Sequence, residues 1–370
     1  MKRKLHIVSP YIPWPPDYGG AMDVYATIKA LHRQGVEIVL HCFAYGGRKP
    51  VPPGQQFFTA IHYYKRKKTL PFRTPYIVAS RKNEQLLNRL LEDDAPVLLE
   101  GIHCSWPVLD KRFSGRKMAV RSFNAEFEYY QVLAQNTRSA WKKWYYRTES
   151  RLLHNYERKV AQNTTIFAIS EADAAIYRNQ LGAADARVLP VAFEGSAEMP
   201  TGKGNYCLYH GNLSVAENEE AVLWLLEAVF PGVPVPLVIA GKNPSVRLEQ
   251  AIKKLPGAQL KANCSEQEMA ELAAGAHIHV LPAINSTGVK LKILYALYHG
   301  RFCITNTAGA NGLNQPNLLW VGDNAGEWKT QIQELFTQSF TAEMASERRK
   351  LLEHYFSPEK QAEQLSAYLW

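Results

Sequence analysis

The sequence has few cysteines and no pattern that would join them. Five cysteines occur among 370 residues, with no CxxC pair and no histidine partner at zinc-finger spacing. This distribution argues against a disulfide framework and against a structural zinc site, and it predicts reduced, buried thiols. The five are Cys42, Cys104, Cys207, Cys264 and Cys303.

Long hydrophobic runs are also missing. The N-terminal segment MKRKLHIVSPYIP has only a short apolar stretch before Pro10, too short for the hydrophobic region of a secretory signal peptide. The most apolar window, which begins at Ala221, contains Glu227 and three prolines, so it predicts a helix, a turn and a strand. We therefore expect a cytoplasmic protein with neither an export signal nor a transmembrane segment.

Positive charge is in excess. The chain has 43 lysine and arginine residues against 34 acidic residues, which gives a formal net charge of +9 and predicts an anionic partner. Much of the excess lies in the first half, where YYKRKK and WKKWYYR mix cations with tyrosine and tryptophan. This mixture suits an anionic inner-membrane surface, and a solvated loop is the alternative. No recognisable RNA- or DNA-binding module accompanies it, so we expect no nucleic-acid partner.

Short apolar strands alternate with helical segments along the chain. In the first half, LHIVS, VEIVLHCFA, APVLLEG, KMAVRSF and TIFAIS are separated by helical stretches such as GGAMDVYATIKALHRQG. A polar, glycine-rich segment at 194–205 interrupts the pattern, and a second series of strands and helices follows it. This alternation predicts an α/β fold with two doubly wound parallel sheets. We expect one domain over 1–195, a second over 203–355, and a last helix over 356–370.

Adjacent glycines, Gly19 and Gly20, stand where the first strand gives way to a helix. They permit close approach of a phosphate to backbone amides at the helix start, and a plain tight turn is the alternative. A dinucleotide site is not expected, because no GxGxxG follows the strand. The segment YHGNLS repeats the arrangement in the second half, where Gly211 and Asn212 end a strand.

Polar residues follow two strands of the first half. LEGIHCSW places His103 after one strand, and VRSFNAEFEYY places Asn124 and Glu126 after the next. The carboxyl ends of parallel strands face the binding crevice of such sheets, so these three residues are candidate catalytic groups. A structural role is the alternative for His103.

The segment NSTGVKLKILYALYHG at 285–300 predicts a loop followed by a helix. The first helical turn contains Lys290 and Lys292, although cations at a helix N-terminus are unfavourable by about 0.3–1 kcal/mol. We therefore expect an anionic ligand at this helix end, closer to Lys290 than to Lys292.

The order and spacing of these segments resemble glycosyltransferase family 4, the retaining enzymes of the GT-B fold. The resemblance spans nearly the whole chain and is carried by PPDYGG, RSFNAEFEYY, IFAIS, YHGNLS, VIAG and TGVKLKILYALYHGRFCITNTAGANGL. It implies two Rossmann-like domains that face a central cleft. The first domain would bind the acceptor, the second would bind a nucleotide sugar, and the last helix would return to the first domain.

The resemblance also implies a donor site made of glycine-rich loops and the helix that follows TGVK. The chain departs from the family at Asn212, which replaces a basic residue, and at Thr287 and Tyr295, which occupy the positions of paired glutamates. Lys290 and Lys292 are expected to compensate for the lost phosphate-binding cations. The candidate donor-binding residues are Gly19, Gly20, Gly211, Asn212, Lys242, Thr287, Gly288, Val289, Lys290 and Tyr295.

The implied function is a metal-independent hexosyltransferase. It would move a sugar from a nucleotide-diphosphate donor, with retention, to a glycan or lipid-linked acceptor in cell-surface polysaccharide or lipopolysaccharide synthesis. No cofactor is expected, because the nucleotide sugar is a substrate and no DxD-like pair is placed for a metal. The alternatives are a catalytically silent subunit that binds a sugar nucleotide or a glycan, and a sugar-nucleotide epimerase of the same fold.

Overall fold

Two compact units make up the chain in the computed structural model. One unit contains Met1–Glu194 and Phe356–Trp370, and the other contains Gly195–Tyr355. No helix within the described part of the chain is both long and apolar enough to cross a membrane. The structure describes residues 3–16, 19–44, 47–48, 50, 57–69, 73–137, 139–195, 198–285, 288–313 and 316–370.

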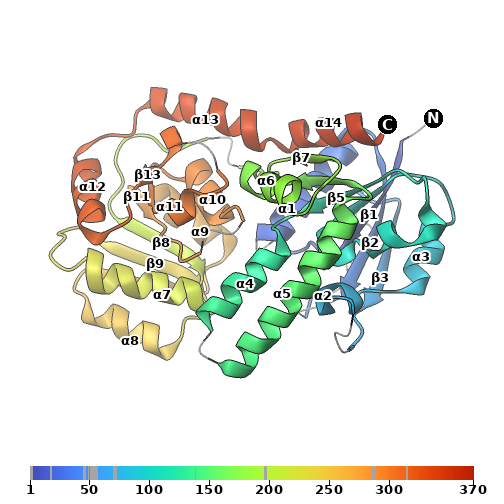
Figure 1. Ribbon diagram of the computed structural model, residues 1–370. Helices are drawn as coiled ribbons and strands as arrows, with labels where there is room; N and C mark the ends of the chain where they lie inside the picture. The colour runs from blue at the N-terminus through green and yellow to red at the C-terminus, as the bar shows by residue number, and fades with distance from the viewer. Residues whose placement is uncertain are drawn as a thin grey trace. The chain divides into compact units, whose positions relative to one another are not determined.

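A sheet of seven parallel strands forms the centre of the first unit (Figure 1). Leu5, Ile7 and Val8 of its inner strand β1 are fully buried, as expected for a strand covered on both faces. The chain order reverses between β1 and β4, which opens the carboxyl edge of the sheet at that point. In spatial order the strands are β3 (Ala60–Lys65), β2 (Glu37–Ala44), β1 (Lys4–Ser9), β4 (Val97–Glu100), β5 (Met118–Ser122), β6 (Thr165–Ala168) and β7 (Ala186–Val188).

The second unit repeats this topology with six parallel strands. Its switch point lies between β8 and β11, so residues that follow these two strands meet at one edge of the sheet. In spatial order the strands are β10 (Ala258–Ala262), β9 (Leu237–Lys242), β8 (Cys207–Asn212), β11 (Ile278–Val280), β12 (Phe302–Thr305) and β13 (Trp320–Val321). The predicted α/β fold with two doubly wound parallel sheets is confirmed.

Helices connect the strands in both units. In the first unit they are α1 (Gly19–Arg33), α2 (Tyr76–Ala79), α3 (Glu84–Leu90), α4 (Glu126–Asn136), α5 (Ala140–Ala161) and α6 (Glu171–Asn179). In the second they are α7 (Ala216–Trp224), continued by a π-helical turn (Leu225–Val229), then α8 (Val246–Lys254), α9 (Glu266–Gly275), α10 (Leu291–His299), α11 (Thr307–Ala310) and α12 (Ala325–Thr337). The chain ends with α13 (Ala342–Phe356) and α14 (Pro358–Leu369).

The last helix belongs to the first unit, as the sequence predicts. Helix α14 starts with Pro358 after the N-cap Ser357 and packs on α1 (Figure 1). Thr27 Oγ1 of α1 donates a hydrogen bond to Gln361 Oε1 at 2.5 Å, and both side chains are buried. Leu365 of α14 is fully buried in the same core as Ile28. This packing ties the C-terminus to the first helix of the chain.

Local signals fix other helix ends. Ser265 and Glu268 form a capping box at the start of α9, with each side chain bonded to the other residue's backbone amide. The long aromatic segment after β5 is broken into α4 and α5, and Ser139 caps α5 by accepting a hydrogen bond from the backbone of Lys142. These caps satisfy amides that a helix start leaves without intrahelical partners.

Candidate functional site

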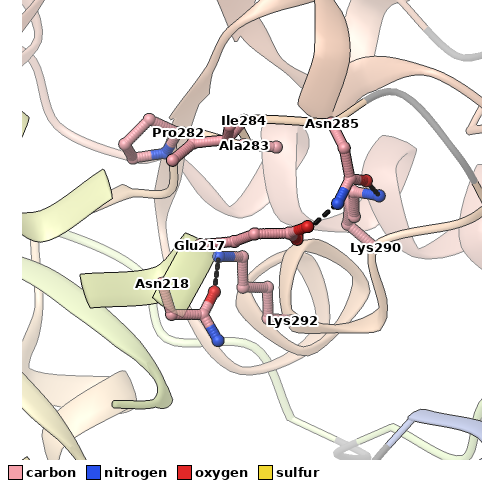
Figure 2. A pocket seen from close by; sticks show the side chains of 8 residues that line it. All are labelled: Glu217, Asn218, Pro282, Ala283, Ile284, Asn285, Lys290 and Lys292. Atoms are coloured by element: carbon pink, nitrogen blue, oxygen red, sulfur yellow. Dashed lines mark hydrogen bonds between the residues drawn. The ribbon is translucent and has the colours of Figure 1, made fainter. Parts of the chain in front are cut away.

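A small pocket lies beyond the carboxyl ends of β8 and β11 in the second unit, between the starts of α7 and α10 (Figure 2). Its volume is about 90 Å³. Complete ligand sites usually enclose roughly 300–1,000 Å³, so this pocket accommodates one chemical group rather than a whole nucleotide sugar. The lining residues are Glu217, Asn218, Pro282, Ala283, Ile284, Asn285, Lys290 and Lys292.

A chain of hydrogen bonds fixes Lys290 at one side of the pocket. Lys290 Nζ donates to Asn285 Oδ1 at 2.7 Å, and Asn285 Nδ2 donates to the carboxylate of Glu217 (Figure 2). Glu217 lies in the first turn of α7, where the helix dipole favours a negative charge. Asn285 therefore links an ammonium group to a carboxylate through one side-chain amide.

A second chain of hydrogen bonds holds Lys292. Its Nζ donates to Asn218 Oδ1 at 3.0 Å and lies 5.0 Å from the centre of the Tyr209 ring. Burial lowers the pKa of Lys292 to about 8, and the neighbouring charge of Lys290 acts in the same direction. Two lysines thus converge on one pocket, and each is held by an asparagine (Figure 2).

The start of α10 adds to the positive potential of the pocket. Lys290 is the N-cap residue and offers no side-chain oxygen to the first-turn amides, and the first turn contains no acidic residue. The amides and the helix dipole therefore attract negative charge to the same place as the two lysines. Ala283, on the opposite wall, is fixed by Asn306, whose Oδ1 accepts from the Ala283 amide at 3.0 Å. This arrangement is suited to an anion such as a phosphate group.

Glycines keep the neighbouring strand ends close together. Gly211 of β8 pairs with Gly241 of β9, and a Cβ atom at Gly241 would lie 2.0 Å from the Gly211 carbonyl oxygen. Asn212 and Lys242 form the next pair along these strands. Four of the strand-end positions are therefore neighbours, and three of them, Gly211, Asn212 and Lys242, are predicted donor-binding residues.

Asn218 joins these strand ends to the pocket. Its Nδ2 donates to the backbone oxygen of Asn212 at 2.9 Å, while its Oδ1 accepts from Lys292. Asn212 Oδ1 in turn accepts from the amide of Ser214 at 3.1 Å. The predicted residue Asn212 and the lysine of α10 therefore share one asparagine.

The other predicted donor residues lie in different surroundings. Gly288 has a φ of +66°, which favours glycine, and it stands with Val289 directly before Lys290. Thr287 lies outside the described residues. Tyr295 does not line the pocket: its ring stacks on His299 at 4.3 Å between centroids and contacts His210 edge-on at 5.3 Å. Gly19 and Gly20, in the first unit, are the first two residues of α1.

Candidate catalytic residues in the first unit form a separate group around Glu126. Glu126 is nearly buried at the start of α4, and burial raises the pKa of its carboxyl group to about 7. Asn124 donates a side-chain hydrogen bond to this carboxyl group. The backbone amide of Glu126 donates to Glu157 Oε1 at 2.9 Å. A carboxyl group poised near neutral pH is suited to proton transfer.

His103 lies in a 3₁₀ turn (Ile102–Cys104) directly after β4. Burial lowers its pKa well below the ordinary value, and the positive charge of Arg81 contributes in the same direction. The charge of Arg81 also acts on Glu126, so this nearly buried guanidinium lies near both candidates. Within the described ranges, His103 Nδ1 is buried without a hydrogen-bond partner. His103 is therefore neutral.

A buried ion pair fixes the strand ends beneath this group. Arg121 at the end of β5 lies 2.7 Å from the Asp23 carboxylate of α1 and 3.8 Å from that of Glu100 at the end of β4. All three side chains are essentially inaccessible to solvent, and burial raises the pKa of Glu100 to about 7. The pair ties β4, β5 and α1 together at the carboxyl edge of the sheet.

Several residues of these two groups were not predicted from the sequence. Glu217, Asn218 and Asn285 were not predicted as site residues, and neither was Arg81. The signal for the first two was their position in a polar helix start, ENEE, directly after a strand end. For Arg81 no signal existed, because a single arginine between two short helices is typical of a solvated loop. Within the described parts of the chain, no group of three His, Cys, Asp or Glu side chains is arranged to hold a metal ion.

Part of the sequence is similar to glycosyl transferases. Residues 204–338, which include the pocket, match the family described as glycosyl transferases group 1. An uncharacterized 44.6 kDa protein of the cps region of Klebsiella pneumoniae is 25% identical over 349 residues, covering 88% of this chain and 86% of that protein.

Solved structures share the fold over the full length of the chain. The sucrose-phosphate synthase of Thermosynechococcus elongatus superimposes with a TM-score of 0.74 at 13% identity, covering 99% of this chain and 98% of that one. Anabaena HepE, solved in complex with UDP and glucose, gives a TM-score of 0.66 at 14% identity, with 99% of each chain covered. The chain therefore has the GT-B fold of these structures, and residues 204–338 are similar to the group 1 glycosyl transferases.

Proposed function

We propose that this protein transfers a sugar from a nucleotide-diphosphate donor to a glycan or lipid-linked acceptor in cell-surface polysaccharide or lipopolysaccharide synthesis. The observation that carries the proposal is the convergence of Lys290 and Lys292 on one pocket at the start of α10. The relative from a cps region supports the pathway, and the UDP and glucose bound to HepE support the donor class.

The chemical step has one main electrostatic demand. The bond between the anomeric carbon and the diphosphate oxygen breaks, the same carbon bonds to the acceptor oxygen on the same face, and the acceptor proton leaves. Negative charge accumulates on the departing diphosphate, so fixed cations and amides beside it lower the barrier. Lys290, Lys292 and the first-turn amides of α10 supply that charge. Because they do so, we propose that transfer requires no metal ion.

The remaining predicted residues have roles in this proposal. Gly19, Gly20, Gly211 and Asn212 approach the donor with backbone groups, and Gly288 and Val289 form the loop before the lysines. Lys242, Thr287 and Tyr295 are proposed to contact other parts of the nucleotide sugar. In the first unit, Glu126, oriented by Asn124, would accept or donate the acceptor proton, and His103 would bind the acceptor sugar.

A catalytically silent subunit is the second candidate. It is favoured by one observation: Tyr295, at the position of a family glutamate, packs against His210 and His299 rather than lining the pocket. Such a subunit would bind a nucleotide sugar without breaking it. Hydrolysis of the donor in the absence of acceptor therefore separates the two functions.

The proposal is tested with a panel of UDP, GDP, ADP, TDP and CMP sugars. A bound donor raises the melting temperature by mass action, and the stabilising donor is then assayed for hydrolysis and transfer in EDTA and in Mn²⁺. We expect stabilisation by one nucleotide-diphosphate class and equal turnover in both buffers. Binding without turnover would support the silent subunit, and turnover only with Mn²⁺ would reject metal independence. If none of the donors raises the melting temperature, the proposed function is wrong.

A further inference from the structure

Two tryptophans project from the start of α5. Trp141 and Trp144 are each 65% exposed, and their rings lie 5.5 Å apart between centroids. Tyr145 contacts Trp141 edge-on at 5.9 Å, which makes a continuous aromatic surface over the first two turns. Figure 1 shows α5 beside α4, so the opposite face of the helix is covered and these rings are on the outer face. Fully buried tryptophan rings stabilise a fold, whereas rings exposed to this extent contribute little to it.

Cations surround the aromatic surface. Lys142, Lys143, Arg147 and Arg151 lie in the N-terminal part of α5, and Glu149 is the single acidic residue in the 140–151 sequence. Glu149 is buried and accepts a hydrogen bond from the backbone amide of Ile77 at 3.2 Å. The outer face of this part of α5 is therefore positive. Lysines near a helix N-terminus oppose the helix dipole, so the fold itself gives no reason for them.

A second basic segment lies next to this helix. Residues 65–68 are Lys-Arg-Lys-Lys, and the three lysines are exposed. The guanidinium of Arg66 lies over the ring of Tyr76 at 5.5 Å, and both Arg66 and Tyr76 are close enough to Tyr145 to act on its pKa. Two stretches of sequence nearly 80 residues apart therefore bring their cations to the same part of the first unit.

We propose that this surface docks the protein on an anionic phospholipid bilayer. We call it the docking surface; it consists of Trp141, Lys142, Lys143, Trp144 and Arg147 of α5 with Lys65, Lys67 and Lys68. Tryptophan rings insert at the level of lipid headgroups, and lysine and arginine attract anionic lipids. A second protein chain would more readily meet an apolar patch with few charges, because charged residues are depleted in interface cores. The inference rests on the proposed function only in that a lipid-linked acceptor would lie on the same membrane.

Vesicle flotation tests the inference without donor or acceptor. The full chain is mixed with vesicles of phosphatidylcholine alone or of phosphatidylcholine with 30% phosphatidylglycerol, in low and high salt. We expect flotation with the anionic vesicles that weakens in high salt, and little flotation with neutral ones. Absence of flotation with the anionic vesicles at low salt would overturn the inference.

Two double variants and a matched control locate the surface. Lys142→Glu/Lys143→Glu should reduce the bound fraction at least tenfold, and Trp141→Ala/Trp144→Ala should reduce it severalfold while leaving its salt dependence in place. The control Lys253→Glu/Lys254→Glu on α8 changes the net charge equally and should retain most of the binding. An equal loss in the control would overturn the inference, because total charge would then explain binding.

Two further measurements keep the outcomes distinct. Circular dichroism confirms that the variants fold, and size-exclusion chromatography reports the oligomeric state. If Trp141→Ala/Trp144→Ala converts an oligomer to a monomer and leaves flotation unchanged, the surface binds another copy of the chain and the inference is wrong. Thermal stabilisation by the donor, measured on the same variants, reports on the pocket alone. Its loss would count against the proposed function and not against the docking surface.

Discussion

Asn285 accepts a hydrogen bond from Lys290 Nζ at 2.7 Å and donates one to the carboxylate of Glu217. The amide therefore positions the lysine and links it to Glu217 through one side chain. A lysine paired directly with a carboxylate would have to break that pair before it could bind an anionic ligand. In the observed arrangement the ammonium group lines the pocket, where its positive charge would attract a diphosphate.

Removal of this amide should weaken donor binding. With Asn285→Ala, Lys290 loses an oriented hydrogen bond to its charged group, which is worth about 1.5–3 kcal/mol in typical cases. We expect the affinity for the nucleoside diphosphate to fall about tenfold, measured by isothermal titration calorimetry. Asn88→Ala, an exposed asparagine of α3, is the control and should leave the affinity unchanged. An unchanged affinity in Asn285→Ala would show that Lys290 does not need this partner.

Glu217 offers a test of which donor group enters the pocket. Its carboxylate opposes a phosphate, whereas it would accept hydrogen bonds from sugar hydroxyl groups. Glu217→Gln retains an oxygen for Asn285 and removes the negative charge. If the diphosphate lies in the pocket, we expect the nucleoside diphosphate to bind the variant severalfold more tightly.

A second ligand completes the Glu217 experiment. The intact nucleotide sugar is titrated into the same variant. Tighter binding of both ligands supports a phosphate in the pocket. Weaker binding of the sugar nucleotide alone places the sugar hydroxyls beside Glu217, and weaker binding of both contradicts the expected repulsion.

Donor binding should depend on pH through Lys292. Its pKa is lowered to about 8 by burial and by Lys290, so its ammonium group loses its proton as the pH rises from 7 to 9. We expect the affinity for the diphosphate to fall across this range, with calorimetry in buffers of different ionisation enthalpy showing proton uptake on binding above pH 8. In Lys292→Arg, the guanidinium stays charged and the decrease should be absent. A decrease of equal size in that variant would assign the titration to another group.

The same pKa has the opposite consequence for the stability of the free protein. Because the pKa of Lys292 is lower in the folded chain than in the unfolded chain, the folded state binds this proton less tightly. The protonated lysine therefore destabilises the fold at pH values below about 8, and this cost disappears as the pH rises toward 10.5. Lys292→Met should accordingly unfold at a higher urea concentration than the unmodified protein at pH 7, and the difference should shrink at pH 10.

Replacement of Glu126 should raise the stability of the fold and lower the transfer rate. Burial raises its pKa from 4.5 to about 7, so its ionisation destabilises the fold increasingly as the pH rises from 4.5 through 7. Glu126→Gln should therefore raise the melting temperature at pH 8. If Glu126 transfers the acceptor proton, the same variant should lower the transfer rate about 10²–10⁴-fold.

The neighbouring acid provides the control for Glu126. Glu128 lies about half a turn further along α4 and is partly exposed. The variant Glu128→Gln should therefore retain the transfer rate of the unmodified protein. Equal losses in the two variants would point to a change in α4 as a whole. A full transfer rate in Glu126→Gln would remove this residue from the reaction.

The fold could be predicted from the sequence where strands are fully buried. The apolar strands β1, β2, β4, β5 and β6, and their counterparts in the second unit, stand out because both faces are covered. Edge strands escaped prediction. β3 (Ala60–Lys65) and β10 (Ala258–Ala262) are partly exposed and polar, and β7 and β13 contain three and two residues. Such segments lack the continuous apolar run that indicates a buried strand.

The site could be predicted only in part. The pair of lysines at the start of α10 was visible, because first-turn cations are unfavourable without an anion. Their partners were not visible, since Asn218 and Asn285 meet the lysines through the packing of α7 against the 281–285 segment. The expected difference between the lysines is also refined: Lys292 has the lowered pKa, while Lys290 has the hydrogen bond to Asn285. Side-chain networks between distant segments depend on tertiary structure and leave no local pattern.

The assignment of the diphosphate to the start of α10 is tested most directly by the affinity of the matching nucleoside diphosphate for Lys290→Ala and Lys292→Ala. Calorimetry at pH 7 and fixed salt, with Lys253→Ala on α8 as the control, measures it without any assumption about the acceptor. We predict a loss of at least tenfold in each pocket variant, a larger loss in the double variant and no change in the control. Unchanged affinity in the double variant would contradict the assignment of the diphosphate to the start of α10.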